Sequence, residues 1–347
     1  MQSLDFQIHD FDTDVDALRT ELKRTGVTVV RLYTEDDPIL DEYERGMDQA
    51  ASESRPDGGT PNGGRGMGGI TKRFGTGCHV GAAKVRMDPR ARSVHASIYG
   101  VDQVMSSWDA VGILGTDAVR KAFPRQMPVN DPQKHYHTLT GGSLQPHVDV
   151  GIDSYGSRME ERMNAVHPEF SICIQSQFVC RTVPRGGATL VVSPGAYYDL
   201  KSTNPLYFDT SKNNDFCVCT PDGYATLHGT WRAVDCVPRG CLIVWISRLP
   251  HGNKLADPGV DPQRRVVYIA WQARALVPEE EERQSLKRKK INAIMSGGTT
   301  DHWATHVPKV HRGSHYSNAK GLTKVLYTAD HPPVYDANLM ATIEGAM

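Results

Sequence analysis

The sequence lacks an excess of charge of either sign. Its 39 basic and 40 acidic residues give a formal net charge of −1. Proteins that bind nucleic acids usually carry a marked basic excess, so nucleic acid is not expected as a partner. An acidic disordered protein is excluded for the same reason. The neutral total leaves room for a local basic pocket, because a few clustered cations barely change the sum.

Long hydrophobic runs are also missing. No run approaches the roughly 20 apolar residues that a membrane-spanning helix needs, and the first residues show neither the basic nor the apolar region of a secretory signal. We therefore expect a soluble, cytoplasmic protein without a membrane partner. Seven cysteines occur without a Cys-x-x-Cys pair, which favours reduced, mostly buried thiols. No P-loop signature is present either.

Glycine and proline, in contrast, are abundant. The 32 Gly and 21 Pro residues make up 53 of the 347 residues. This share exceeds the roughly 12% that the two residues reach in average proteins, and it indicates many turns. Seven of these glycines lie in residues 58–69, and this segment is a candidate mobile loop beside a site. From about residue 106 to 273, short β-prone runs alternate with turn residues, as in a sandwich or jelly roll. No long amphipathic helix fits between the later runs, which argues against a parallel sheet.

We predict one domain over residues 1–347 with three parts. Residues 1–105 hold two predicted helices, one ending before Gly26 and one over residues 38–54, with a strand at residues 27–33 between them. Residues 274–347 begin with a helix from Pro278, whose acids precede its bases as the helix dipole favours. The core, residues 106–273, has predicted strands at residues 108–114, 135–139, 170–179, 188–193, 217–220, 241–246 and 265–271.

The most informative motif is the pair His147 and Asp149. Residues two apart on a strand point to the same face. Two histidines and one carboxylate form the facial triad of non-haem Fe(II) oxygenases, which leaves open positions on the metal. A lone His-x-Asp pair is expected about once by chance in such a chain. By itself it is equally compatible with a polar pair at a strand end.

The downstream sequence adds a second histidine and an arginine pair. His251 follows the apolar strand at residues 241–246 and precedes a predicted Gly-Asn turn, so its imidazole can project from a rigid element. Arg264 and Arg265 open the next strand, where a guanidinium can bind a carboxylate in a bidentate way. Because the two arginines face opposite sides, only one can point inward. Ordinary surface charge is the alternative for both.

In this order the motifs resemble the Fe(II)/2-oxoglutarate-dependent oxygenases, and among them most closely the phytanoyl-CoA dioxygenase-like branch. The resemblance runs from about residue 69 to 303. It rests on His147-x-Asp149, on the strand followed by His251, and on Arg264-Arg265-Val-Val-Tyr. It also includes a Gly-Gly…Pro-Gly segment at residues 186–195, where Ala196-Tyr197 replace the Ser-His of the family pattern.

The resemblance implies an α+β fold with a mainly β core, namely a double-stranded β-helix (jelly roll, cupin-like) flanked by N- and C-terminal helices. It implies that His147, Asp149 and His251 are the catalytic iron ligands, and that Arg264 binds the C5 carboxylate of 2-oxoglutarate. Fe(II), 2-oxoglutarate and O₂ are then the expected cofactors. The strand before the motif often adds a co-substrate contact in this family. The candidates are Lys134, His135, His137 and above all Tyr136 and Gln145.

The predicted function is oxidation of a small polar metabolite, such as an amino-acid derivative in specialised metabolism. Hydroxylation, desaturation and oxidative cyclisation are all compatible with the motifs, and succinate and CO₂ would be formed. One alternative is an oxygenase that acts on a protein side chain or a nucleobase. Another is a metal-binding cupin without oxygenase activity, although cupins usually use three or four His or Glu ligands. The oligomeric state is not predicted.

Three further sets of residues allow weaker hypotheses. The basic residues of segment 65–92 are candidates for recognising a substrate carboxylate. Aromatic side chains can shape a pocket, and the candidates are Trp108, Tyr136, Tyr155 and Trp245. The spacing of His302, His306, His311 and His315 suits zinc, but Pro308 interrupts any single helix there and no cysteine accompanies them. Hydrogen-bonded or solvated histidines are the preferred interpretation.

Overall fold

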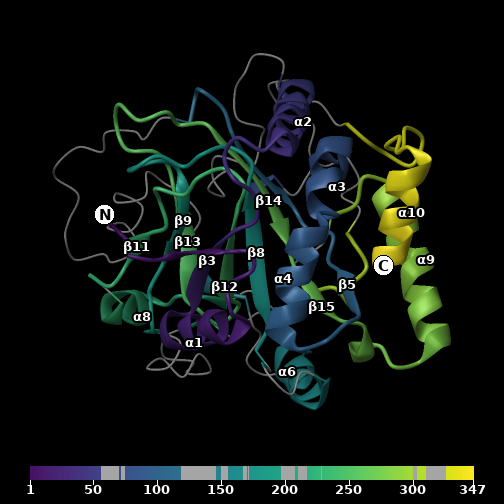
Figure 1. The fold of residues 1–347 in the computed structure, drawn as a ribbon, viewed down its shortest axis with the longest axis horizontal. Helices are drawn as coiled ribbons and strands as arrows, with labels where there is room; N and C mark the ends of the chain where they lie inside the picture. The colour runs from purple at the N-terminus through teal and green to yellow at the C-terminus, as the bar shows by residue number, and fades with distance from the viewer. Residues whose placement is uncertain are drawn as a thin grey trace.

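Two open β-sheets and a surrounding set of helices make up the described part of the chain (Figure 1). The structure is a computed structural model. It describes residues 1–55, 70–71, 75–118, 146–149, 155–166, 170, 172–196, 208–209, 217–227, 229–299, 303–309 and 326–347.

The strands are short in the first sheet and longer in the second. The six-stranded sheet has the order β1 (Gln2–Ser3), β11 (Arg232–Ala233), β9 (Thr189–Val192), β13 (His251–Lys254), β7 (His147–Val148) and β10 (Cys217–Val218). The seven-stranded sheet has the order β2 (Ile8–Asp10), β3 (Val27–Arg31), β12 (Cys241–Ile246), β8 (Ile174–Val179), β14 (Arg264–Ile269), β6 (Val111–Leu114) and β4 (Ile70–Thr71). A separate pair consists of β15 (Trp271–Ala273) and β5 (Val104–Ser106).

The helices lie in the N-terminal third, between strands and at the C-terminal end. They are α1 (Val15–Thr25), α2 (Pro38–Ser54), α3 (Val80–Arg86), α4 (Pro89–Tyr99), α6 (Tyr155–Val166), α8 (Pro221–Thr226), α9 (Glu280–Met295) and α10 (Ala337–Ala346). Short 3-10 turns occur at Thr76–Cys78 and Arg274–Leu276. None of the helices in the described ranges is long and apolar enough to cross a membrane.

Local sequence signals explain where the first helices begin. The Asp14 side chain accepts a hydrogen bond from the amide of Asp16, and the Asp37 side chain accepts one from the amide of Ile39. Each aspartate thereby satisfies one of the amides that a helix leaves without an internal partner. Pro38 occupies the first turn of α2, where its missing amide costs nothing. The helices predicted before Gly26 and over residues 38–54 are confirmed.

The two larger sheets share an apolar core. Leu190 and Val192 of β9 belong to the same buried cluster as Ile243 and Trp245 of β12, which share a face with Gln177 and Gln175 of β8. Helices α2 and α3 pack on β14, and α1 packs on β3. Figure 1 shows α2, α3 and α4 on the side of the seven-stranded sheet that faces away from β9 and β13. One face of this sheet therefore meets helices, and the other meets the six-stranded sheet.

The fold class is confirmed as α+β with a mainly β core. Strand β12 occupies the predicted residues 241–246, and β8, β9 and β14 overlap their predicted ranges. The predicted strand at residues 135–139 and the glycine-rich loop at residues 58–69 lie outside the described residues. Within the described ranges both sheets end at edge strands and neither closes into a barrel. The double-stranded β-helix therefore stays a prediction.

The predicted Gly-Asn turn after His251 is wrong. Gly252 and Asn253 lie inside β13, where they pair with Val191 and Leu190 of β9. The chain reverses before His251 instead, where the amide of Leu249 donates to the carbonyl of Ile246. Pro250 lacks an amide donor and suits that turn better than a paired strand. His251 consequently sits within a strand, and this fixes its direction more firmly than a position after one.

Candidate metal centre

Three side chains that the sequence predicts as metal ligands meet where β7 pairs with β13. His147 and His251 are direct cross-strand partners, and the Cβ atoms of such partners are about 4.5–5.5 Å apart. Their ring centroids are accordingly 4.2 Å apart. Asp149 directly follows β7, and its amide donates to the carbonyl of Ser247 at 2.9 Å. The structure thus brings His147, Asp149 and His251 together.

The ligand atoms of this triad are close enough to hold one ion. One atom from each residue lies within 4.8 Å of the others. Nε2 of His147 is 3.6 Å from Oδ1 of Asp149, and Nε2 of His251 is 3.3 Å from Oδ2 of the same carboxylate. Both imidazoles are buried and Asp149 is half-buried. Across the described ranges, no other group of His, Cys, Asp or Glu side chains has this geometry.

Hydrogen bonds from neighbouring groups orient two of the three ligands. Nδ1 of His251 lies 2.8 Å from the carbonyl oxygen of Leu249. Because a carbonyl only accepts, Nδ1 carries the proton and Nε2 presents its lone pair to a metal. Nε2 of Gln175 donates to Oδ2 of Asp149 at 2.9 Å and to Oγ of Ser247 at 3.2 Å. Oδ1 of Asp149 is thereby favoured as the metal-binding atom.

Arg264 points into the space between the two sheets. It is 2% exposed, and its Nη1 and Nη2 donate to Asn253 Oδ1 at 3.1 Å and to Gln177 Oε1 at 2.6 Å. Asn253 is two residues after His251 on β13, and Gln177 is two residues after Gln175 on β8. Residues two apart share a strand face and lie about 7 Å apart. The guanidinium and the triad therefore face the same interior.

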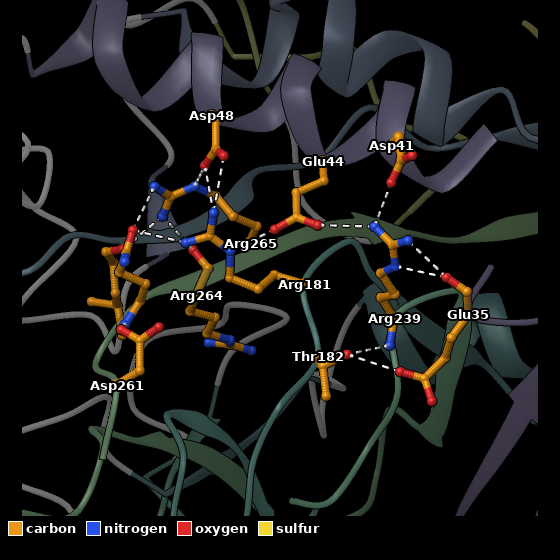
Figure 2. Close-up of polar contacts among 12 residues, drawn as sticks. Glu35, Asp41, Glu44, Asp48, Arg181, Thr182, Arg239, Asp261, Arg264 and Arg265 are labelled. Atoms are coloured by element: carbon orange, nitrogen blue, oxygen red, sulfur yellow. Dashed lines mark hydrogen bonds and ion pairs between the residues drawn. The ribbon is translucent and has the colours of Figure 1, made fainter. Parts of the chain in front are cut away.

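Arg265 points to the opposite side of β14, toward α2 (Figure 2). Its Nε donates to Oδ1 of Asp48 at 2.8 Å. Figure 2 shows the side chain of Arg264 directed away from that helix. As the alternation of a strand requires, only one of the two arginines faces the interior, and it is Arg264.

The outer side carries an ionic network along α2. Its members are acids of the helix and arginines from the ends of the strands beneath it. Arg181 binds Glu44 at 2.8 Å and Asp48 at 2.9 Å, and Arg239 binds Asp41 at 2.7 Å (Figure 2). This network joins α2 to the segments that follow β8 and precede β12, so it fixes the helix on the sheet that carries Arg264.

Two polar atoms near Arg264 are buried without a hydrogen-bond partner in the described residues. They are Nε2 of Gln177 and the hydroxyl of Tyr268, and the hydroxyl lies beside Arg264 and Asn253 without reaching full hydrogen-bond geometry with either. Burial raises the pKa of the Tyr268 hydroxyl, which therefore stays protonated at neutral pH. Gly112 borders the same space, because a Cβ there would lie 3.6 Å from Arg264 Cζ and 2.4 Å from Val266 Cγ2.

These residues fit an iron ion and an anionic co-substrate. Two imidazole nitrogens and one carboxylate are the donor set that suits non-haem Fe(II). The neighbouring interior offers a guanidinium held by neutral amide oxygens together with two further donors, Gln177 Nε2 and Tyr268 OH. A carboxylate accepts hydrogen bonds at both of its oxygens, so it is the chemical complement of that set.

The other predicted site residues lie in different places. The ring centroid of Trp245 is 5.6 Å from that of His251, so this side chain packs beside the triad. Trp108 packs in the core instead, where its Nε1 donates to Cys78 Sγ at 3.4 Å and Arg86 lies 4.6 Å from its ring centroid. Several candidates lie outside the described residues, namely Lys134, His135, Tyr136, His137, Gln145, Tyr197 and the side chain of Tyr155.

The described cations of the basic segment bind groups of the fold rather than facing the triad. Lys84 pairs with Glu42 of α2. Arg86 is fully buried and donates to the carbonyls of Gly77 and Asp109. Among the four spaced histidines only His306 is described, and its ring lies 6.3 Å from that of Trp303. None of the seven cysteines forms a disulfide with another cysteine in the described residues, and all except Cys236 are buried.

Sequence reasoning missed the residues that support the triad and Arg264. They are Gln175, Gln177, Asn253 and Tyr268. A signal exists in retrospect, because two glutamines two apart place polar amides on one face of β8. Asn253 repeats this offset from His251, and Tyr268 lies on the Arg264 face of β14. The partners of these four side chains depend on the order of the strands in the sheets, and that order cannot be read from the sequence.

The sequence matches no known protein-family profile and no curated protein. Among solved structures, a hypothetical protein from Escherichia coli is 11% identical over 97% of this chain and 85% of its own, with a TM-score of 0.49. The epimerase SnoN, solved in complex with Fe3+, alpha ketoglutarate and nogalamycin RO, is 13% identical over 75% of this chain and 83% of its own, with a TM-score of 0.44. GlcNAc Inducible Gene 2 of Candida albicans is 11% identical over 98% of this chain and 83% of its own, also with a TM-score of 0.44. At these values no functional argument rests on the similarities.

Proposed function

We propose that this chain is a non-haem Fe(II)/2-oxoglutarate-dependent oxygenase that oxidises a small polar metabolite. The observation that carries the proposal is the common interior of the His147, Asp149 and His251 triad and the Arg264 guanidinium. On β8, Gln175 binds the triad member Asp149, and Gln177, two residues later, binds Arg264. On β13, Asn253 binds Arg264 and lies two residues after His251 of the triad. A five-carbon 2-oxo diacid has a chelating end and a carboxylate end, which matches a metal site with a buried cation nearby.

When bound, Fe(II), 2-oxoglutarate and O₂ supply the oxidising chemistry, which yields succinate and CO₂ while a substrate C–H bond is hydroxylated, desaturated or closed into a ring. The residues of the chain bind and orient. His147 and His251 present their Nε2 atoms, and Asp149 presents Oδ1 while Gln175 holds Oδ2. Arg264 receives the distal carboxylate, since a guanidinium can bind a carboxylate in a bidentate way.

The same proposal includes a double-stranded β-helix as the core of the fold. We infer that the described sheets are the two halves of a double-stranded β-helix within one domain over residues 1–347. In support, antiparallel β9, β13, β7 and β10 lie across a shared interior from antiparallel β3, β12, β8, β14 and β6, which is how a jelly roll is built. Within this class the motifs favour the phytanoyl-CoA dioxygenase-like branch. Tyr136 and Gln145 remain candidates for further co-substrate contacts.

The proposed substrate is small because the triad is deeply placed. Both imidazoles are buried and only Asp149 is half-buried. A metabolite can reach such a site more easily than a folded protein or a duplex nucleic acid can. Amino-acid derivatives are a reasonable first set of substrates to screen. Succinate formation that rises with a peptide or an oligonucleotide, and with no metabolite, would replace this substrate class with a macromolecule.

Metal binding followed by turnover tests the proposal. The protein is stripped of metal with a chelator, titrated with Fe(II) without oxygen, and then given 2-oxoglutarate, ascorbate and O₂. We expect one Fe(II) per chain and slow formation of succinate even without substrate. His251→Ala should lose both, whereas His9→Ala, on the edge strand β2, should keep both. A wild-type protein that binds no Fe(II), or a His251→Ala variant with wild-type turnover, would refute the assignment.

A further inference from the structure

Gln175 uses only one end of its side-chain amide within the described part of the protein. Its Nε2 donates to Oδ2 of Asp149 at 2.9 Å and to Oγ of Ser247 at 3.2 Å. An ionised carboxylate can only accept hydrogen bonds, so the nitrogen must face Asp149 and the oxygen, Oε1, must face away from it. No group of the described residues donates to Oε1. The amide therefore has an unused acceptor next to a metal ligand.

This acceptor lies on the accessible side of the metal centre. Unlike Nε2 of Gln177, Oε1 of Gln175 is not sealed off from solvent, and Gln175 as a whole is 6% exposed. Within the triad, the side chain of Asp149 is 15% exposed, against 4% for His147 and 5% for His251. A molecule that approaches the metal centre therefore meets Asp149 and Gln175 before it meets the two imidazoles.

The surroundings of Gln175 hold the acceptor in a fixed position. Two hydrogen bonds fix the nitrogen end of the amide. Its cross-strand partner on β12 is Trp245, whose ring centroid is 5.6 Å from that of His251. Because Oε1 belongs to the same amide group as Nε2, it stays close to the Asp149 carboxylate. An acceptor fixed in this way loses little freedom when it binds a ligand.

We propose that Gln175 Oε1 binds an amino or hydroxyl group of the substrate, next to the carbon atom that is oxidised. This inference rests on the proposed function and deepens it, because it names the chemical class of the substrate. Gln175 then has two tasks, since its nitrogen orients the metal ligand Asp149 and its oxygen positions the substrate. An ammonium group is the preferred donor, because hydrogen bonds with one charged partner are roughly twice as strong as neutral ones.

Calorimetry on the full chain measures this preference without turnover. The protein is saturated with Mn(II) and 2-oxoglutarate in the absence of oxygen. It is then titrated with the common L-amino acids and, for each of them, with the matching 2-hydroxy acid and the matching unsubstituted acid. We expect at least one series in which the amino acid binds about 10-fold or more tightly than the unsubstituted acid, with the hydroxy acid in between.

Two variants and one control assign the preference to Oε1. In Gln175→Leu, again saturated with Mn(II), the three ligands of that series should bind with nearly equal affinity. Gln175→Met keeps the length of the side chain without the amide, and it should give the same result. Ser247→Ala is the matched control, because it removes the other acceptor of Nε2 and leaves Oε1 in place. This control should keep the wild-type order of affinities.

The ratio of the affinities separates substrate recognition from support of the metal ligand. If Gln175 only supported Asp149, Gln175→Leu would weaken all three ligands of a series equally and keep their ratio, and this result would overturn the inference. So would a wild-type protein in which no series favours the amino or the hydroxy acid. Either result leaves the oxygenase proposal standing. A wild-type protein that binds Mn(II) but not 2-oxoglutarate would instead defeat the proposed function itself.

Discussion

Arg264 and Arg265 are adjacent in the chain, but they meet opposite kinds of surroundings. On the helix side of β14, Arg265 meets the carboxylate of Asp48, which neutralises it. Facing the other sheet, Arg264 donates to the amide oxygens of Asn253 and Gln177. The helix side therefore consists of ion pairs that hold α2 on the sheet. The interior side carries the buried guanidinium at which we propose that the co-substrate binds.

The difference shows how one strand can serve stability and binding at the same time. Side chains of a strand alternate between two faces, so the residues that fasten β14 to α2 are interleaved with those that face the triad. The ionic network on α2 can therefore hold the backbone of Arg264 in place without entering the interior. The following predictions test how sharply the two faces are separated.

The largest effect is expected for the two arginines. Arg264→Ala should weaken 2-oxoglutarate binding to the metal-loaded protein at least about 30-fold, since truncating one partner of a buried, charged hydrogen-bonded pair costs about 2–5 kcal/mol. Arg265→Ala should leave that affinity nearly unchanged and lower the free energy of unfolding by about 1.5–3 kcal/mol. Calorimetry and urea unfolding of both variants measure the two quantities. If instead Arg265→Ala weakened 2-oxoglutarate binding and Arg264→Ala lowered only the free energy of unfolding, Arg265 would be the residue that binds the co-substrate.

Gln175→Leu should have the next largest effect, on metal affinity. The change removes the donor that holds Asp149 Oδ2, and losing a hydrogen-bond partner of a metal ligand typically weakens binding roughly 10–100-fold. Titration with Mn(II) measures the loss. Ser176→Ala is the control, because the Ser176 hydroxyl donates to the carbonyl of Ile269 instead of reaching the triad. Equal metal affinity in Gln175→Leu and the wild type would show that Asp149 needs no such support.

A third buried cation extends the comparison to pH. Lys290 of α9 is fully buried and donates to the carbonyls of Ser106 and Ala304. Burial lowers the pKa of Lys290 to about 7, so between about pH 7 and the usual lysine range the unfolded chain binds more protons than the folded one. Stability should therefore rise with pH above about 7, by at most about 1.4 kcal/mol per pH unit. An arginine in the same position would keep its proton.

Urea unfolding between pH 7 and pH 9 checks this prediction. Lys290→Met should remove its part of the rise, while Lys289→Met, at an exposed position of the same helix, should keep the wild-type slope. Identical slopes in all three proteins would mean that Lys290 retains its proton in the folded chain.

The smallest effect is expected at the rim of the ionic network. Arg239 binds Asp41 and Glu44, and the Asp41 side chain is 55% exposed. Because exposed ion pairs contribute little, Arg239→Ala should lower the free energy of unfolding by about 0.2–1 kcal/mol. High salt should reduce the difference, whereas the loss in Arg265→Ala should persist. A larger loss for Arg239→Ala would show that the whole network acts as one unit.

Elements with strong local signals were predictable from the sequence. The span of α2 follows from its aspartate cap and Pro38, and that of β12 from an apolar run with flanking turn residues. Helices α3 and α4 escaped prediction. The hydrophobic periodicity of α4 is weak, and its exposed Arg90 and Arg92 lie over the aromatic rings of Tyr33 and Trp271. Strand β13 depends on pairing with β9, which no local signal encodes.

The candidate site divides in the same way. His147, Asp149 and His251 could be proposed because metal ligands follow a spacing rule, and the alternation of faces left one inward arginine to choose. Gln175, Gln177 and Tyr268 follow no such rule. Their positions matter only because β8 lies between β12 and β14 and opposite β7 and β13, and this order forms from pairings between distant parts of the chain.

The short strand β7 gives the triad one more consequence. Two residues form β7, and a single residue pair, His147 with His251, joins it to β13. Among the described residues, few backbone hydrogen bonds secure this junction, although it connects His147 with His251, about a hundred residues further along the chain. An ion bound by both histidines would hold β7 against β13. It would act as a cross-link that closes the long loop of chain between His147 and His251. Metal occupancy and local unfolding of this edge are therefore thermodynamically linked, and hydrogen exchange at Val148 should slow when the ion is added.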